Sequence, residues 1–434
     1  MKYYSTNKSA PEASLSEAVI KGLAPDKGLY MPETIKRMPD SFFAGIKNMS
    51  FQEISLEVAK AFFGEDIPEA KLKEIVYDAL NFDTPLVKIE DGIYSLELFH
   101  GPTLAFKDVG ARFMARMLGY FVSQEGADKE VNVLVATSGD TGSAVANGFL
   151  GVKGINVIVL YPKGKVSEIQ EKQFTTLGQN ITALEIDGTF DDCQRLVKSA
   201  FMDDELNKHM NLSSANSINV ARFLPQAFYY FNAYAQALRE GVSGELVVSV
   251  PSGNFGNLTA GLFAKRMGLP VKRFIAANNR NDIFLGYLNT GKYNPRPSVA
   301  TLANAMDVGD PSNFARILDL YGGSHEAITK DISGYRYTDE SIRKVAKEAF
   351  DRTGYLLDPH GACGYEALKD GLKESETGIF LETAHPAKFL ETVESIIGRR
   401  IEIPAKLQAF MKDEKRSIAM SADFDDFKKF LMER

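Results

Sequence analysis

Short apolar runs, each followed by a turn and a helix-like segment, dominate the hydrophobic pattern of the chain from about residue 130 onward. Strands that are apolar on both faces and alternate with helices are typical of parallel sheets covered on both sides. We therefore expect an α/β fold with two open, mostly parallel sheets that carry helices on both faces. The runs are VNVLVA (131–136), INVIVLY (155–161), ITALEI (181–186), ELVVSV (245–250), VKRFIAA (271–277) and GIFLET (378–383).

Residues 1–90 have a different pattern, in which apolar residues recur three or four apart, as in SFQEISLEVAKAFF from Ser50. This spacing predicts amphipathic helices and a mostly helical N-terminal domain. We expect a large α/β domain made of residues 91–128 and 235–434. A small α/β domain is expected over residues 129–234.

Composition narrows the class of protein. A chain of 434 residues exceeds the usual size of one hydrophobic core, and its formal charge of −7 argues against nucleic-acid binding. Two cysteines, Cys193 and Cys363, fit a reducing compartment, and no apolar run is long enough to span a membrane. The N-terminus lacks a secretory apolar core, so we expect a cytoplasmic protein that does not enter membranes. The histidines and cysteines are not spaced as metal ligands, and no metal is expected.

The turn after the run at 245–250 reads PSGNFGNLTAG (251–261). Ligands of open α/β sheets bind beyond the carboxyl ends of strands. Gly253 and Gly256 would let an anion approach the backbone, and Ser252, Asn254 and Asn257 add polar groups before a helix expected near Leu258. The spacing matches neither a P-loop nor a dinucleotide motif. A tight glycine turn with a capping side chain explains the same residues equally well.

The turn after the run at 131–136 reads TSGDTGSA (137–144) and is rich in hydroxyl groups. Hydroxyls and backbone amides at a helix start suit a carboxylate ligand. Asp140 does not suit an anion, and we expect it to be the N-cap of the following helix. The hydroxyl and glycine residues of this turn are Thr137, Ser138, Thr141, Ser143, Gly139 and Gly142.

Lys107 follows a turn and an apolar segment in LELFHGPTLAFKDVG (96–110). Most lysines are solvated surface charges, but desolvation lowers the pKa of an ammonium group and makes it available as a nucleophile or base. A lysine that forms a Schiff base is the obvious use of such an amine.

Five motifs in order, LELFHGPTLAFKD, ATSGDTGSA, NSINVARFLPQ, PSGNFGN and ETAHPAKF, resemble those of the threonine synthases. These are fold-type II pyridoxal-phosphate enzymes, with the tryptophan synthase β-like fold. The N-terminal segments YYSTN and GLAPDKGLYMPE extend the resemblance over nearly the whole chain.

The resemblance implies roles for individual residues. Lys107 would bind pyridoxal 5'-phosphate covalently and then carry protons. Thr383 would face the pyridine nitrogen, and Asp140 stands where many relatives have an Asn that contacts the phenolic oxygen. The cofactor-binding residues would be Lys107, Ser252, Gly253, Asn254, Phe255, Gly256, Asn257, Thr383 and Asp140. The substrate-binding residues would be Thr137, Ser138, Gly139, Thr141, Gly142, Asn216, Ser217, Arg222 and Asn254.

The implied reaction converts O-phospho-L-homoserine and water to L-threonine and phosphate, the last step of threonine biosynthesis, which makes the enzyme a lyase. A serine or threonine dehydratase, or a phospho-lyase that yields 2-oxobutyrate, is the nearest alternative. A non-catalytic small-molecule-binding α/β module is an alternative of another class. The chain is expected to be a monomer or a homodimer.

Overall fold

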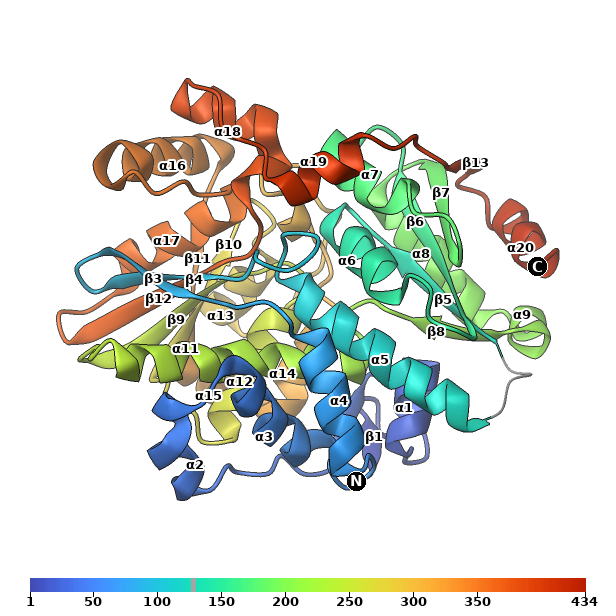
Figure 1. Ribbon diagram of the computed structural model, residues 1–434, viewed down its shortest axis with the longest axis horizontal. Helices are drawn as coiled ribbons and strands as arrows, with labels where there is room; N and C mark the ends of the chain where they lie inside the picture. Colours follow the sequence, from blue (N-terminus) through green and yellow to red (C-terminus); the bar gives the residue numbers. More distant parts are fainter. Residues whose placement is uncertain (126–129) are drawn as a thin grey trace. The chain divides into compact units, whose positions relative to one another are not determined.

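Two mostly parallel sheets form the centres of two compact units in the computed structural model, which describes residues 1–125 and 130–434 (Figure 1). Unit 1 contains residues 1–33, 107–222 and 403–434, and unit 2 contains residues 34–106 and 223–402. The fold class expected from the sequence is confirmed.

The units group the chain differently from the domains expected from the sequence. Residues 1–90 are divided between them, and residues 403–434 lie in unit 1. The expected boundary at 128/129 lies outside the described residues. The three-domain division stays a prediction.

The sheet of unit 2 has the strand order β11–β10–β9–β12–β4–β3. Its neighbours pair in parallel, except that β3 and β4 form an antiparallel hairpin. Parallel pairing brings the carboxyl ends of β4, β9, β10 and β12 to one edge of the sheet. The strands are β3 (Leu86–Glu90), β4 (Ile93–Glu97), β9 (Glu245–Pro251), β10 (Arg273–Asn278), β11 (Ile332–Arg336) and β12 (Glu376–Glu382).

Helices cover both faces of this sheet (Figure 1). On one face α17 (Pro359–Gly371) packs against β9, β10 and β12, with α16 (Asp339–Thr353) outside it. On the other face lie α11 (Ala227–Arg239) and α12 (Gly256–Arg266). Neighbouring residues of β10 face opposite ways, because Ile275 belongs to the core with α17 while Phe274 contacts Tyr230 of α11. Burial on both faces explains the continuous apolar run.

The sheet of unit 1 has the order β13–β7–β6–β5–β8, with parallel pairing throughout. Alternate residues of its central strands pack against α8 (Phe190–Met202) and α20 (Phe424–Met432), while α6 (Asp140–Phe149) contacts β5 and β6. The strands are β5 (Val131–Ala136), β6 (Ile155–Pro162), β7 (Ile181–Asp187), β8 (Asn211–Ser214) and β13 (Ile418–Ser421). A separate antiparallel pair joins β1 (Tyr3–Ser5) to β2 (Tyr30–Pro32).

The remaining helices surround these sheets. The amphipathic segment expected from Ser50 is α3 (Phe51–Phe63), which Ser50 and Glu53 close with a capping box. In unit 1 the others are α1 (Leu15–Lys21), α5 (Lys107–Glu125), α7 (Glu168–Thr175), α9 (Asp204–His209), α10 (Val220–Phe223) and α19 (Ala405–Met411). In unit 2 they are α2 (Asp40–Gly45), α4 (Glu69–Ala79), α13 (Ile283–Thr290), α14 (Phe314–Leu320), α15 (His325–Asp331) and α18 (Leu390–Ile397).

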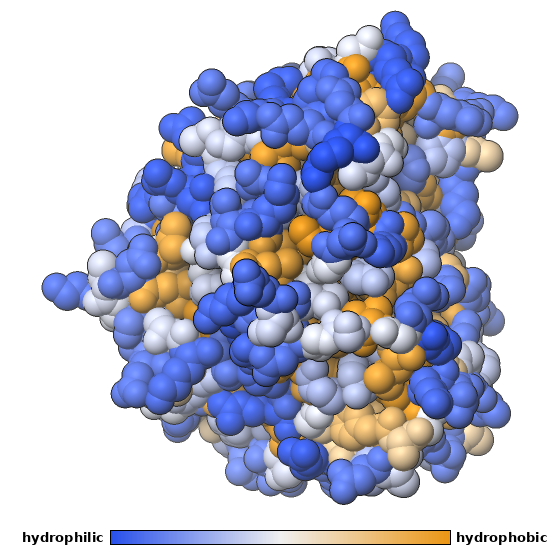
Figure 2. Space-filling model, turned by 90° about the vertical axis from the view of Figure 1, so that its left-hand side faces the viewer, coloured by the Kyte–Doolittle hydropathy of each residue, from blue (hydrophilic) through white to orange (hydrophobic). Residues whose placement is uncertain are grey.

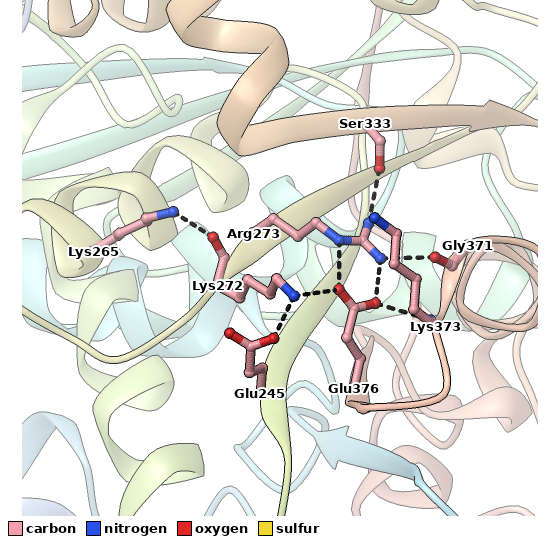
Figure 3. A network of polar contacts seen from close by, with 8 residues as sticks. All are labelled: Glu245, Lys265, Lys272, Arg273, Ser333, Gly371, Lys373 and Glu376. Carbon is pink, nitrogen blue, oxygen red and sulfur yellow. Dashed lines mark hydrogen bonds and ion pairs between the residues drawn. The ribbon is translucent and has the colours of Figure 1, made fainter.

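An ion-pair network ties together the amino ends of the unit 2 strands, at the edge opposite their carboxyl ends (Figure 3). The buried Glu376 carboxylate accepts two bonds from Arg273, from Nε at 3.1 Å and from Nη2 at 2.6 Å. Lys272 Nζ lies 3.3 Å from the same carboxylate and also pairs with Glu245. Because Glu376 begins β12 and Arg273 begins β10, the pair spans the intervening β9.

Hydrophilic side chains predominate on the face drawn in Figure 2, and hydrophobic ones lie among them in small groups. None of the helices in the described residues combines the length and apolar character needed to cross a membrane.

Candidate active site

The segment 252–257 follows β9 at the carboxyl edge of the unit 2 sheet. Ser252 donates its backbone N–H to Ala277 O at 2.9 Å and its hydroxyl to Val250 O at 2.8 Å. A Cβ atom added to Gly253 would lie 2.7 Å from Ala305 O, so only glycine fits there. Phe255 has a φ of +62° and directly precedes α12. A bulky residue in this region of φ is uncommon and indicates a turn whose shape is imposed by its surroundings.

Asn257 presents hydrogen-bond donors in the first turn of α12. Its Oδ1 accepts the hydroxyls of Tyr229 and Tyr230 at 2.6 and 2.7 Å. These bonds orient the amide, and its buried Nδ2 has no hydrogen-bond partner among the described residues. The first intrahelical bond runs from Thr259 N–H to Phe255 O, so the amides before it have no acceptor in the helix. Buried donors at a helix N-terminus suit a phosphate group.

Thr383 directly follows β12 at the same edge of the sheet and is buried. Its carbonyl oxygen accepts the backbone N–H of Phe106 at 2.8 Å. Beside it, Ala105 and Ala384 form an isolated bridge, and the two segments therefore run alongside each other.

Lys107 is the first residue of α5, directly after the anchored Phe106, and its side chain is half-buried. Leu104, three residues earlier, has a φ of +57°, which makes the preceding turn tight. A second lysine, Lys388, was missed by the sequence analysis as a site element. It is fully buried and donates from Nζ to Thr103 O at 2.7 Å. Lys388 thereby fixes the loop that precedes Lys107.

The hydroxyl-rich turn 137–142 follows β5 in unit 1. Thr137 Oγ1 accepts the backbone N–H groups of Gly139 and Gly142 at 2.9 and 2.8 Å. Gly139 has a φ of +140°, and an added Cβ would lie 2.6 Å from the side chain of Gln170. The turn is therefore built around the Thr137 hydroxyl and two glycines. Ser138 and Thr141 are half-buried, and Ser143 is buried.

The expectation that Asp140 is the N-cap of α6 is wrong. Gly139 is the N-cap, and Asp140 is the first helical residue. The buried Asp140 carboxylate accepts Gln170 Nε2 at 2.9 Å, and the Thr137 hydroxyl takes the capping bonds instead. Gln170 lies in α7 and was missed, because nothing local in SEIQ shows that it returns to the turn.

Asn216 lies at the same carboxyl edge of the unit 1 sheet, since its Nδ2 donates to Ala136 O at 3.1 Å. Ser217 is in the turn between Asn216 and α10, and both are half-buried. Arg222 is buried in α10, and a Cβ added to Gly110 of α5 would lie 2.5 Å from its Nη1. Asn216 and the 137–142 turn are thus brought together. A polar helix start, the simpler interpretation of NSINVAR, describes the turn into α10 equally well.

Two histidines of the motifs orient their neighbours. His100 Nε2 lies 2.7 Å from Glu97 Oε2, and His385 Nδ1 accepts the N–H of Ala387 at 3.1 Å. Burial, followed by the charge of His100, lowers the pKa of His385 to about 4. His385 is therefore neutral near pH 7. In the described part of the chain, no group of three or more His, Cys, Asp or Glu side chains is arranged to hold a metal ion.

Family models match almost the entire chain. One described as a pyridoxal-phosphate dependent enzyme covers residues 78–381. Models described as the threonine synthase N terminus and C-terminal region cover residues 2–80 and 361–431. The chain belongs to the threonine synthase family. The resemblance drawn from the motifs is confirmed.

Individual relatives agree with the family models. The chain is 45% identical over 432 residues to the threonine synthase of Escherichia coli, covering 100% of this chain and 99% of the relative. The crystal structure of threonine synthase from Escherichia coli matches with a TM-score of 0.94 and 44% identity, covering 100% of both chains. The structure of threonine synthase with bound pyridoxal phosphate from Brucella melitensis matches with a TM-score of 0.91 and 35% identity, covering 100% of this chain and 99% of that one.

As a member of the threonine synthase family, the protein is a pyridoxal-phosphate-dependent lyase of fold type II. The cofactor, when bound, stabilises negative charge that develops on the substrate carbons next to its imine. The 252–257 segment fits the phosphate of this cofactor, because the orphaned Nδ2 of Asn257 needs an acceptor and Gly253 leaves the backbone accessible.

Proposed function

We propose that the substrate of this threonine synthase family member is O-phospho-L-homoserine, which it converts with water to L-threonine and phosphate. The placement of Asn216 beside the 137–142 turn supports the proposal. Asn216 and the turn together provide polar side chains and N–H groups at one edge of the sheet. Such groups suit a ligand that carries both a carboxylate and a phosphate.

We assign the residue roles as follows. Lys107 would hold the cofactor covalently through its amine and would carry protons between substrate atoms. Ser252, Gly253, Asn254, Phe255, Gly256 and Asn257 hold the cofactor phosphate, while Thr383 and Asp140 contact its ring. Thr137, Ser138, Gly139, Thr141 and Gly142 bind the substrate carboxylate, and Asn216, Ser217, Arg222 and Asn254 bind the substrate phosphate.

The overall conversion balances without a further reactant. Protons leave Cα and Cβ, phosphate leaves Cγ, and hydroxyl from water adds to Cβ while the other proton of the water ends on the released phosphate. Protons return to Cα and Cγ to leave the methyl group of threonine. The Lys107 amine serves as the base at Cα and returns the proton there, which requires a pKa near the working pH. A site closed to bulk water would prevent early release of a keto acid.

Product analysis tests the substrate and separates the alternatives. Purified protein with pyridoxal phosphate and O-phospho-L-homoserine should release equal amounts of threonine and phosphate. A phospho-lyase would yield 2-oxobutyrate with phosphate. A dehydratase would yield keto acid from serine or threonine but no threonine from O-phospho-L-homoserine. A binding module would yield no product from any of these compounds.

We further propose a cytoplasmic location and a monomeric or homodimeric state. The two free, buried cysteines, Cys193 and Cys363, support a reducing compartment. Light scattering of the purified protein distinguishes a monomer or dimer from larger assemblies, which would contradict the proposal.

A further inference from the structure

His360 lies in the first turn of α17, with its ring buried. Its Nε2 accepts the backbone N–H of Ala305 at 3.2 Å. A ring nitrogen that accepts a hydrogen bond carries no proton, so the ring is neutral with its proton on Nδ1. Nδ1 faces Asp358 Oδ2 at 3.4 Å, which is longer than a normal hydrogen bond. Asp358 therefore favours the tautomer that leaves Nε2 free to accept.

Asp358 is fixed in place by two further bonds. Its Oδ1 accepts Gly361 N–H at 2.6 Å as the N-cap of α17, and its own N–H donates to Glu382 Oε1 at 2.7 Å. Burial and the charge of Asp358 raise the pKa of Glu382 well above its usual range. The two bonds to Gly361 and Glu382 hold the Asp358 carboxyl group where its Oδ2 faces His360 Nδ1.

Ala305 lies against the proposed phosphate site. It belongs to a 3-10 turn, η3 (Asn304–Met306), whose own bonds are donated by Met306 and Asp307. The Ala305 N–H precedes these bonds, and the His360 ring satisfies it instead. A Cβ on Gly253 would lie 2.7 Å from Ala305 O and 3.2 Å from Met306 Cα, so η3 packs directly on the 252–257 segment.

We propose that His360 is a positioning residue for the cofactor phosphate: its Asp358-oriented ring holds Ala305, and through it η3, against Gly253. The proposal rests on the assignment of residues 252–257 as the phosphate site. It makes the tautomer of the ring, rather than the bulk of the side chain, the decisive property.

Two variants separate the tautomer from the packing. Asp358→Asn keeps an N-cap, since Asn caps helices as well as Asp does. The amide of Asn can donate a hydrogen bond to Nδ1, which moves the ring proton to Nε2. Nε2 then points its own N–H at the Ala305 N–H and can no longer accept a hydrogen bond from it. His360→Gln keeps an acceptor, the side-chain amide oxygen, at about the distance from the backbone at which Nε2 lies. His360→Phe keeps a ring of similar shape but has no acceptor.

The measurement is the dissociation constant of pyridoxal phosphate, obtained by titrating each apoenzyme. It is combined with hydrogen exchange of the peptide that contains Ala305 and with kcat and KM. Asp358→Asn and His360→Phe should bind the cofactor about tenfold more weakly, the effect of one unsatisfied buried donor. Both should exchange the Ala305 amide at least tenfold faster. His360→Gln should return both values to within about threefold of the original protein.

His325→Gln is the matched control and should change neither value, because the His325 ring contacts the carbonyls of Tyr287 and Leu288 instead. Unchanged exchange and affinity in folded Asp358→Asn and His360→Phe would overturn the proposal, as would failure of His360→Gln to recover either value. Asn257→Asp tests the underlying assignment separately. If Asn257→Asp retains full cofactor affinity, the phosphate-site assignment fails, while faster exchange in Asp358→Asn would still report the link from His360 to Ala305.

Discussion

The backbone N–H of Phe106 donates to the carbonyl oxygen of Thr383 over 2.8 Å. The two residues are 277 positions apart but follow neighbouring parallel strands, β4 and β12, in which Glu97 pairs with Glu382. The register of one strand pair therefore decides where Phe106, the residue before Lys107, lies relative to Thr383. A side chain that must reach a fixed ring benefits from such an anchor, because misplacement by about 1 Å can cost about 100-fold in rate.

Asn257→Asp should weaken binding of pyridoxal phosphate by a factor of about 100 or more. The substitution keeps the shape and an acceptor for Tyr229 and Tyr230, but it replaces the unpartnered Nδ2 with a charged oxygen facing the phosphate. Titration of the apoenzyme measures the loss. Tyr230→Phe is the control, and it should weaken binding far less because Tyr229 still orients the amide. Equal losses in the two variants would contradict the assigned role of Nδ2.

Arg222→Lys should raise KM for O-phospho-L-homoserine about tenfold or more while the visible absorbance of bound cofactor persists. Lysine keeps the positive charge but cannot offer the planar pair of donors that a guanidinium gives to a phosphate. Steady-state kinetics and an absorbance spectrum of the same sample provide the check. Loss of the cofactor absorbance with an unchanged KM would instead place Arg222 in cofactor binding or folding.

His385→Asn should flatten the dependence of the free energy of unfolding on pH between about 6.5 and 4. Burial holds the pKa of His385 at about 4 in the folded chain, below the ordinary value near 6.5. The unfolded chain therefore binds the proton first, and stability present above pH 6.5 is lost as the pH falls toward 4, by up to about 3 kcal/mol. Asn can still accept the Ala387 N–H but does not titrate. Denaturant unfolding at several pH values measures both slopes, and equal slopes would contradict the assignment.

Glu376→Gln should destabilise unit 2 by about 3 kcal/mol at neutral pH, because it removes the buried charge that pairs with Arg273. The hydrogen bonds from Arg273 lower the pKa of Glu376 to about 2. The folded pKa is thus below the unfolded value, so this stabilisation is complete above about pH 4.5 and is lost as the pH falls toward 2. The difference between the variant and the original protein should shrink over that interval. A constant difference would mean that packing rather than charge is responsible.

The apolar inner strands of the two sheets could be predicted from the sequence, but the inner strand β4 and the edge strands could not. Each of the six apolar runs forms a strand, because central parallel strands are buried on both faces. β11, ISGYR, is a half-exposed edge strand, and β13, IAMS, is mostly exposed. Neither has an apolar run that distinguishes it from a loop.

In the candidate site, too, residues with a local sequence pattern could be predicted, and residues placed by long-range contacts could not. The glycine-rich turns after β5 and β9 can be recognised in the sequence, because glycine and small polar residues are the types that tight turns require. The contributions of Gln170 and His360 depend on long-range contacts with Asp140 and Ala305, and no local pattern shows them. The expectation that Asp140 is the N-cap of α6 is wrong for the same reason, since the partner of Asp140 lies 30 residues away in α7.

Borohydride reduction followed by peptide mapping tests the central claim, that Lys107 is the amine that holds the cofactor. Reduction of the purified protein should fix pyridoxal phosphate on the peptide containing Lys107 and end the activity. Lys107→Ala should show no fixed cofactor and no visible absorbance of a lysine imine. Cofactor fixed on the buried Lys388, or an original protein whose Lys107 peptide remains unlabelled, would show that Lys107 is not this amine.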